Sequence, residues 1–371
     1  MKTLLKGGTV FQNGRFSRVD VLADSGVVVD IQPDLPESSG DLVFFLHGAH
    51  LLPGLADIHV HFRQPGAGYK ETISTGTAAA AHGGFTLVCP MPNVDPPPDT
   101  PAHLEQQLTI IRRDARVPTV PYACITLGRQ GRQLVDMAAL AGQVAGFSDD
   151  GGGVQSDDMM RAAMRAAAAC GAVICAHCED DSLVKGGVIH AGAFAAAHGF
   201  AGIASESEWR QIERDIALVA ETGARYHICH VSTKEGVALV RAAKKRGLPV
   251  SCETAPHYLC FCDEDLQDDG RFRMNPPIRA REDQEALIAG VADGTIEVIA
   301  TDHAPHSAEE KSGGLAASLM GVVGLETALA ACYTQLVLGG HLSLEALVQR
   351  MSIGPRQVLG LAPVAIAVGQ P

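Results

Sequence analysis

The sequence lacks the features that mark membrane, secreted and nucleic-acid-binding proteins. No run of about 18 apolar residues is present, which argues against a membrane-spanning helix. The first six residues lead into glycines and polar residues, so we expect no secretory signal. With 29 Lys and Arg against 42 Asp and Glu, the net charge is −13, and no basic stripe is dense enough to bind phosphates. We therefore expect a cytoplasmic protein that binds neither membrane nor nucleic acid.

Cysteine is present, but its distribution does not indicate a disulfide framework. The ten cysteines are scattered along the chain, and several lie in apolar segments, where buried thiols in a reducing compartment are expected. Cys175 and Cys178 form a C-x-x-C motif. In an extended strand these two side chains point to opposite faces, which favours packing over a redox or zinc role.

The length of the chain and its pattern of apolar, polar and turn-forming residues predict an α/β protein with three parts. Residues 1–52 show short alternating strands with turn signals at Asn13-Gly14 and Asp24-Ser25-Gly26, which indicates a small β-sandwich-like domain. In residues 53–360, apolar strands alternate with Ala-rich helical segments, as expected for a (β/α)8 TIM-like barrel of about 250 residues or more. We expect the tail, residues 361–371, to return toward the β domain, whose C-terminal part is predicted to be short or absent.

The predicted barrel has eight strands separated by segments of helix length. The strands are predicted at residues 56–61, 86–90, 119–125, 143–148, 173–177, 226–230, 249–253 and 297–301. Helices are predicted at residues 156–170, 206–222, 234–246 and 283–292, which are long enough for right-handed crossovers. The alternative is an open doubly wound sheet, which usually has fewer strands and a Gly-rich phosphate turn after the first. The run Gly151-Gly152-Gly153 follows the fourth strand and lacks a P-loop lysine, so we interpret it as a loop.

The pair His59 and His61 lies at the end of the first predicted barrel strand. A lone His-x-His motif is weak evidence, but residues two apart on a strand face the same side. In a barrel that side is the interior, and active sites lie at the carboxyl ends of the strands.

Other strand ends carry residues of the same chemical type. They are Asp149-Asp150 after the fourth strand, His177 after the fifth, His230 after the sixth and Asp302 after the eighth. Imidazole and carboxylate groups are ligands for zinc or a similar ion. Each alone could be a core histidine or a helix cap, but five strand ends agree. Four histidines and two carboxylates are too many for one tetrahedral ion and predict two ions.

Three further residues are suited to a small anionic substrate. Arg63 can bind a substrate carboxylate through two parallel hydrogen bonds. The alternative is a structural salt bridge between Arg63 and a nearby acidic residue. Asn93, after the second strand, can offer its amide or serve as a turn residue. His306 follows Asp302 by four residues, on a loop that could close over a ligand.

Taken together, the motifs resemble those of the dihydroorotases, specifically the longer bacterial type, in the cyclic amidohydrolase superfamily. The resemblance spans almost the whole chain. It rests on the segments DIHVHFRQPG at 57–66, PMPN at 90–93, FSDDG at 147–151, AHCE at 176–179, HVS at 230–232, ETAPHY at 253–258, NPPIR at 275–279, TDHAPH at 301–306 and GLET at 324–327.

The resemblance implies a role for each matching residue. One zinc ion would be held by His59, His61 and Asp302, a second by His177 and His230, and Asp150 would bridge the two. Asp302 would also be the catalytic acid/base. The family's substrate-binding residues correspond to Arg63, Asn93, Asn275, His306, Met320 and Gly321, and the family usually has Phe where this sequence has Met320.

The implied reaction is the reversible hydrolysis of (S)-dihydroorotate to N-carbamoyl-L-aspartate in pyrimidine (UMP) biosynthesis, by attack of a metal-activated hydroxide on the ring amide. The resemblance also implies a homo-oligomer and a possible complex with aspartate transcarbamoylase.

Two alternatives remain at this point. Hydantoinases and allantoinases share the barrel but use a carboxylated lysine as the bridge. No lysine occurs between Lys70 and Lys185, which favours Asp150. An inactive dihydroorotase-like scaffold for aspartate transcarbamoylase would lack metal ligands, whereas all six expected ligands are present.

Overall fold

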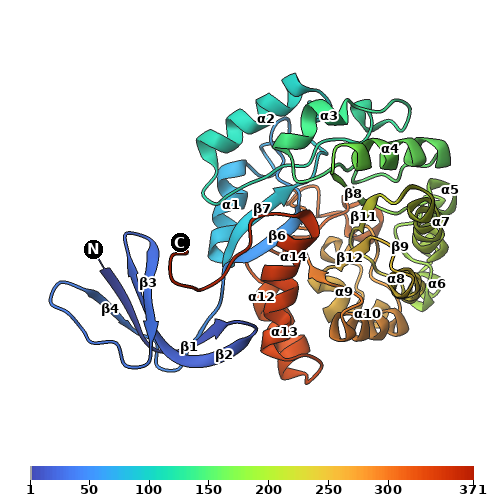
Figure 1. The fold of residues 1–371 in the computed structure, drawn as a ribbon. Coiled ribbons are helices and arrows are strands. Elements are labelled where there is room, and N and C mark those ends of the chain that lie inside the picture. The colour runs from blue at the N-terminus through green and yellow to red at the C-terminus, as the bar shows by residue number, and fades with distance from the viewer. Residues whose placement is uncertain (1) are drawn as a thin grey trace.

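The computed structural model describes residues 2–371 and begins with a β-sheet (Figure 1). Its strands are β1 (Lys2–Gln12), β2 (Arg15–Asp24), β3 (Val27–Gln32), β4 (Leu42–Phe45) and β5 (His50–Leu51). They form one five-stranded sheet in the order β3-β2-β1-β4, with β5 also paired to β1. Asn13, Gly14, Ser25 and Gly26 all have positive φ, which matches the two-residue turns that join twisted antiparallel strands. The two predicted turns are therefore confirmed.

The rest of the chain forms a parallel barrel. Its strands are β6 (Leu55–Val60), β7 (Phe85–Pro90), β8 (Val173–Ala176), β11 (Arg225–Ile228), β12 (Val250–Thr254) and β13 (Val298–Ile299). The pairs β6–β7, β8–β11, β11–β12 and β12–β13 are all parallel. The barrel closes where His61 N–H donates to the carbonyl of His303 at 2.8 Å. The predicted TIM-barrel fold is therefore confirmed.

The predicted third and fourth strands are the exception, because residues 119–125 and 143–148 form only isolated bridges. Thr119 pairs with Val88, and Phe147 pairs with both Ala123 and Ile174. The backbone hydrogen bonds between β7 and β8 still run through these segments. Pro118 and Pro121 lack the N–H group that a continuous ladder needs. Local sequence therefore shortens the strands without opening the barrel.

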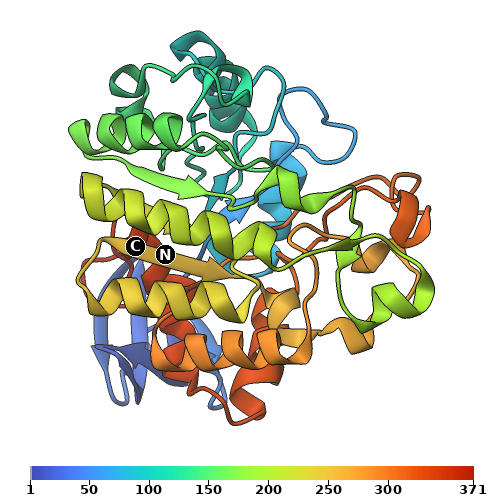
Figure 2. The same cartoon turned by 90° about the vertical axis from the view of Figure 1, so that its right-hand side faces the viewer.

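Helices cover the outside of the barrel, and Figure 2 shows α7, α8 and α10 side by side on one flank. The longer helices are α1 (Ile73–His82), α2 (Pro101–Asp114), α4 (Asp157–Ala169), α7 (Glu206–Thr222), α8 (Lys234–Lys245) and α10 (Arg281–Asp293). The hydroxyls of Ser156 and Thr233 accept N–H bonds at the starts of α4 and α8, which satisfies otherwise unpaired donors. The four predicted helices are confirmed to within a few residues.

Shorter elements fill the loops at the carboxyl ends of the strands and the end of the chain. They are α3 (Met137–Leu140), α5 (Asp181–Val184), α6 (Ala193–His198), α9 (Pro256–Cys260), α11 (Gly314–Ala317), α12 (Ala328–Cys332), α13 (Leu344–Val348) and α14 (Gly354–Leu359), with a two-stranded ribbon of β9 (Ile189–His190) and β10 (Gly202–Ile203). The last residues run from α14 back to the sheet, where Gly369 N–H donates to Val28 at 2.8 Å (Figure 1). The division of the chain at residues 52 and 360 stays a prediction.

Two of the expectations from composition can be compared with the structure directly. All ten cysteines are free and most are buried, as predicted, and Cys178 packs 3.5 Å from the Tyr226 hydroxyl. Across residues 2–371, no helix has the length and apolar character needed to cross a membrane.

Candidate active site

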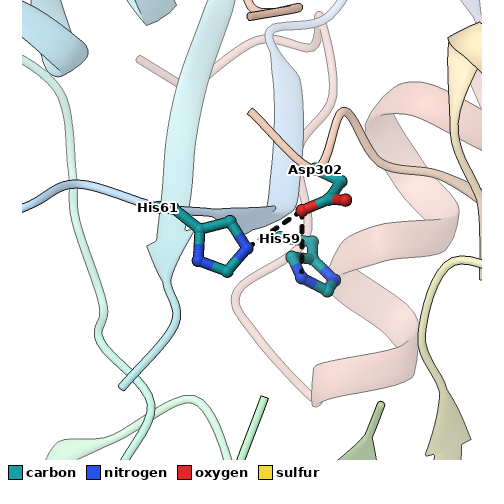
Figure 3. A group of neighbouring side chains, drawn as sticks. All are labelled: His59, His61 and Asp302. Carbon is teal, nitrogen blue, oxygen red and sulfur yellow. Dashed lines mark hydrogen bonds and ion pairs between the residues drawn. The ribbon is translucent and has the colours of Figure 1, made fainter. Parts of the chain in front are cut away.

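Six side chains meet at the carboxyl ends of the barrel strands, and we call them the floor cluster: His59, His61, Asp150, His177, His230 and Asp302. His59 and His61 project from the end of β6 into the barrel, because residues two apart share a face. Asp302 Oδ1 lies 2.9 Å from His61 Nε2 and 3.5 Å from His59 Nε2, as Figure 3 shows. Asp302 lies more than 240 positions from the two histidines in the chain, yet the three residues form a compact ligand set.

Asp150 lies between this set and the other two histidines. Its Oδ1 is 3.3 Å from His59 Nε2, 3.4 Å from His230 Nε2 and 3.7 Å from His177 Nδ1. Its second oxygen, Oδ2, is 3.5 Å from His61 Nε2. One carboxylate therefore faces all four imidazoles of the cluster.

The donor atoms fit divalent metal ions. Ligand atoms about 2.0–2.1 Å from a tetrahedral zinc ion lie about 3.3 Å apart, close to most of the separations given above. His59 Nε2 and Asp150 Oδ1 are buried and have no hydrogen-bond partner among residues 2–371. Unpaired buried polar atoms are costly, so their convergence on one point indicates a cation. The set satisfies the requirements of a metal centre in number, type and spacing of ligands.

The charges of the floor cluster also favour the binding of a cation. Burial lowers the pKa of His59, but the charges of Asp150 and Glu253 outweigh burial and hold this pKa well above its usual value. Burial raises the pKa of Asp302, but a hydrogen bond with His61 and the charge of His59 bring it far below the usual range. Two ionised carboxylates in a buried space produce a negative potential that attracts either protons or metal ions.

Backbone geometry at two members of the cluster is unusual. His230 and Asp302 have φ values of 34° and 49°, in the left-handed region that non-glycine residues seldom adopt. Such residues cost about 1–3 kcal/mol each and persist where the surroundings fix them. The fold thus maintains strained backbone at two strand ends that carry ligand-type side chains.

Behind the floor cluster lies a buried hydrogen-bonded chain that the sequence did not reveal. His59 Nδ1–H donates to Glu253 Oε1 at 2.6 Å, and the other Glu253 oxygen lies 3.1 Å from His227 Nε2. His227 Nδ1 in turn lies 2.8 Å from Ser251 Oγ. Burial raises the pKa of Glu253, but the charge of His59 and a hydrogen bond with His227 lower it to about 2. Glu253 thereby fixes the His59 ring with Nε2 toward the cluster.

Two sequence features relate to this chain: Ser251 and Glu253 lie two residues apart on one face of β12, and Glu253 begins the ETAPHY segment. The same Glu253 forms a third ligand-type group with His59 and Cys229. Its carboxylate is already bonded to two histidines, so its position is explained without an ion.

Residues predicted to bind substrate lie at the rim. Arg63 Nε donates to the carbonyl of Pro305 at 3.2 Å, and its Nη2 lies 3.5 Å from His306 Nε2. Within the described chain Arg63 forms no ion pair, so the salt-bridge alternative is not observed. His306 Nε2–H donates to the carbonyl of Met320 at 2.8 Å. Burial and the charge of Arg63 lower the pKa of His306 to about 4, which keeps its ring neutral near pH 7.

Asn93 and Asn275 are found next to cluster histidines. His61 Nδ1–H donates to Asn93 Oδ1 at 2.9 Å, so Asn93 orients His61 and is more than a turn residue. Asn275 Nδ2 donates to both carboxylate oxygens of Glu179 at 3.0 Å. Sequence reasoning assigned no role to Glu179, which lies two residues after His177.

Residues 304–321 form a segment over the rim that we call the cover. Gly321, with φ 143°, lies so close to Ala304 that a Cβ would meet its carbonyl at 2.5 Å. Lys311 Nζ donates to the carbonyls of Arg273, Leu319 and Gly321 at 2.8–3.0 Å. The half-buried ammonium group of Lys311 therefore ties the cover to the segment at Arg273, which no sequence signal indicated.

A cavity of about 810 Å³ is bounded by the cover, α9 and α12, and none of the six cluster residues lines it. His257 lines it, and His257 Nε2 is buried without a hydrogen-bond partner in residues 2–371. Burial lowers the pKa of His257 to about 4. Its neutral ring is a polar group near the cluster, and its only distinguishing feature in the sequence is its place in the ETAPHY segment.

The barrel and its cluster define a class of protein, the metal-dependent hydrolases of the amidohydrolase superfamily. A family model described as "Dihydro-orotase-like" matches residues 48–236. Proteins named "Dihydroorotase" from Bacillus caldolyticus and Geobacillus kaustophilus (strain HTA426) are each 48% identical to this chain, covering 100% of it and 88% of the relative. The chain belongs to the dihydroorotase family.

Solved structures agree on the fold. An L-hydantoinase (dihydropyrimidinase) from Arthrobacter aurescens superimposes with a TM-score of 0.86 at 25% identity, covering 99% of this chain and 84% of the other. A dihydropyrimidinase from Brevibacillus agri NCHU1002 gives a TM-score of 0.83 at 22% identity, covering 100% and 84%. The predicted family and fold are confirmed.

Proposed function

We propose that this protein hydrolyses (S)-dihydroorotate reversibly to N-carbamoyl-L-aspartate, a step of pyrimidine (UMP) biosynthesis. The observation that carries the proposal is the floor cluster, in which Asp150 faces all four histidines. In this proposal an aspartate, Asp150, would take the bridging position, where a hydantoinase would use a carboxylated lysine. Relatives at 48% identity that are named dihydroorotases support the same reading.

The proposed cofactor is a pair of zinc ions. His59, His61 and Asp302 would hold one ion, His177 and His230 the other, and Asp150 would bridge them. The unpaired buried atoms of His59 and Asp150 support this assignment. When bound, such ions lower the pKa of a water molecule toward neutrality and so supply the nucleophile for amide hydrolysis.

Asp302 is the proposed acid/base. Its depressed pKa keeps its carboxylate ionised at neutral pH, so it can accept the proton that water releases on adding to the ring carbonyl. It would then deliver that proton to the ring nitrogen as the amide bond breaks. Run in reverse, the same transfers close the ring of N-carbamoyl-L-aspartate.

The rim residues are proposed to bind the substrate. Arg63, which has no acidic partner among the described residues, would grip the carboxylate with two hydrogen bonds. Asn93, Asn275 and His306 would complete the polar contacts, with Met320 and Gly321 of the cover closing over the ring. A homo-oligomer and a complex with aspartate transcarbamoylase stay predictions.

Assays with dihydroorotate, hydantoin and allantoin, together with zinc analysis of the purified protein, test the proposal. We expect hydrolysis of dihydroorotate and about two zinc ions per chain. His177→Ala and Asp150→Ala should each lose activity and zinc. If the protein hydrolysed hydantoin but not dihydroorotate, the proposed substrate would be wrong. If the purified protein held no stoichiometric zinc, it would be an inactive scaffold.

A further inference from the structure

Glu179 connects the floor cluster to the rim. Its Oε2 lies 3.4 Å from His177 Nε2, and both of its oxygens lie 3.0 Å from Asn275 Nδ2. Its side chain is only 15% exposed, and no Lys or Arg of residues 2–371 forms an ion pair with it. Burying a carboxylate is costly unless a partner compensates its charge, and no lysine or arginine does so for Glu179. Its role therefore lies in its contacts with His177 and Asn275.

The backbone of Glu179 is fixed in place. Its N–H donates to Gln211 Oε1 at 3.2 Å, and its carbonyl accepts from Gln155 Nε2 at 2.8 Å. A Cβ at Gly153 would meet the same carbonyl at 2.3 Å, so the neighbouring loop is packed against it. Glu179 is therefore held toward His177 and Asn275 and is not a mobile surface acid.

The two ring nitrogens of His177 have different surroundings. Nδ1 faces the cluster, 2.9 Å from His230 Nε2 and 3.7 Å from Asp150 Oδ1. Nε2 faces Glu179, which can only accept a hydrogen bond when ionised. An Nε2–H that donates to this carboxylate leaves the Nδ1 lone pair free for a metal ion, as partners of metal-bound histidines generally do.

The same carboxylate fixes the amide of Asn275. An amide oxygen facing a carboxylate would be repelled, so Nδ2 must face Glu179. That orientation leaves Asn275 Oδ1, which is buried and has no partner in the described chain, as a free acceptor. A free acceptor at the rim suits an N–H group of a cyclic amide, whereas a substrate carboxylate would be repelled by it.

We propose that Glu179 is a positioning residue with two effects: it holds His177 with Nδ1 toward the metal centre, and it turns Asn275 Oδ1 toward a substrate N–H. The second effect rests on the proposed function, because it assumes a cyclic amide substrate. The first concerns metal binding alone.

Zinc titration of the metal-free full-length protein against a competing chelator tests the first effect. In Glu179→Gln, which keeps the size of the side chain, we expect one of two zinc affinities to fall about 10–100-fold, and the other to remain within about threefold. Asp181→Asn is the matched control, since it removes an exposed charge close by, and should leave both affinities unchanged. Unchanged affinities in Glu179→Gln, or equal loss of both with a lowered Tm, would overturn the proposal.

Steady-state kinetics at saturating zinc test the second effect. We expect Glu179→Gln and Asn275→Ala each to raise the KM for dihydroorotate about tenfold, with a smaller change in kcat. In the double variant the KM increase should equal that of the larger single effect, since both changes act on one contact. Multiplicative increases would refute the link through Asn275. If the wild-type protein does not hydrolyse dihydroorotate, the proposed function fails while the zinc titration still decides the role of Glu179 toward His177.

Discussion

The floor cluster and the cover are built in different ways. The six side chains of the floor cluster lie at strand ends and are all buried. Other side chains, such as Glu253 and Asn93, orient them. The cover is a loop held largely through its backbone carbonyls, by Lys311 and His306. Rigid strand ends suit chemistry that needs fixed distances, whereas a tethered loop suits binding. Changes in the floor should therefore affect kcat, and changes in the cover should affect KM.

The largest effect is expected for Asp302→Asn in the floor. Loss of the proton acceptor should lower kcat about 10³-fold, within the range usual for general acid/base groups. The measurement is kcat for dihydroorotate hydrolysis at saturating zinc. Asp158→Asn, which changes an exposed side chain of α4, is the control. A kcat within tenfold of the wild-type value would show that Asp302 is not the acid/base.

A smaller effect is expected for Arg63→Met at the rim, where floor and cover meet. Loss of a charged partner costs about 2–3 kcal/mol, so KM for dihydroorotate should rise about 10²-fold. Dihydrouracil has the same ring without the carboxylate, and its weaker hydrolysis should be unaffected by this substitution. Equal losses for both substrates would mean that Arg63 does not bind the carboxylate.

The cover itself is tested by Lys311→Met. Removing the ammonium group frees three carbonyls, so the loop should loosen and KM should rise about tenfold while kcat changes little. Limited proteolysis should cut within residues 304–321 faster than in the wild type, whereas Lys245→Met, on an exposed face of α8, should behave normally. A fall in kcat without a change in KM would contradict the division between floor and cover.

The smallest effect on catalysis is expected for His190, a histidine outside both regions whose substitution should change stability only. Burial, and then the charge of Arg279, lower the pKa of His190 to about 4. The unfolded chain takes up this proton near pH 6.5 while the folded chain does not, so stability should fall as the pH drops from 6.5 to 4. Between pH 6.5 and pH 4, the free energy of unfolding of His190→Gln should fall by about 1–3 kcal/mol less than that of the wild type, as measured by urea unfolding. An identical pH profile in the variant would place the acid sensitivity elsewhere, the floor cluster included.

The barrel, its main helices and the six members of the floor cluster could all be predicted from the sequence. Strand and helix periodicity depend on local patterns, and active-site residues of a barrel recur at strand ends, so both could be read along the chain. The third and fourth strands were overestimated because Pro118 and Pro121 limit their ladders.

The partner that orients each ligand-type side chain could be identified only in the folded chain. His59 and Glu253 are 194 residues apart, and the side-chain oxygen of Asn93, a residue predicted to bind substrate, accepts a hydrogen bond from His61. Glu179 ends the AHCE segment and Lys311 lies in none of the quoted segments, and the role of each depends on the residues that pack against it. Hydrogen bonds between distant strands and loops are set by packing in three dimensions, so the orientation of the site is a property of the fold that no local spacing encodes.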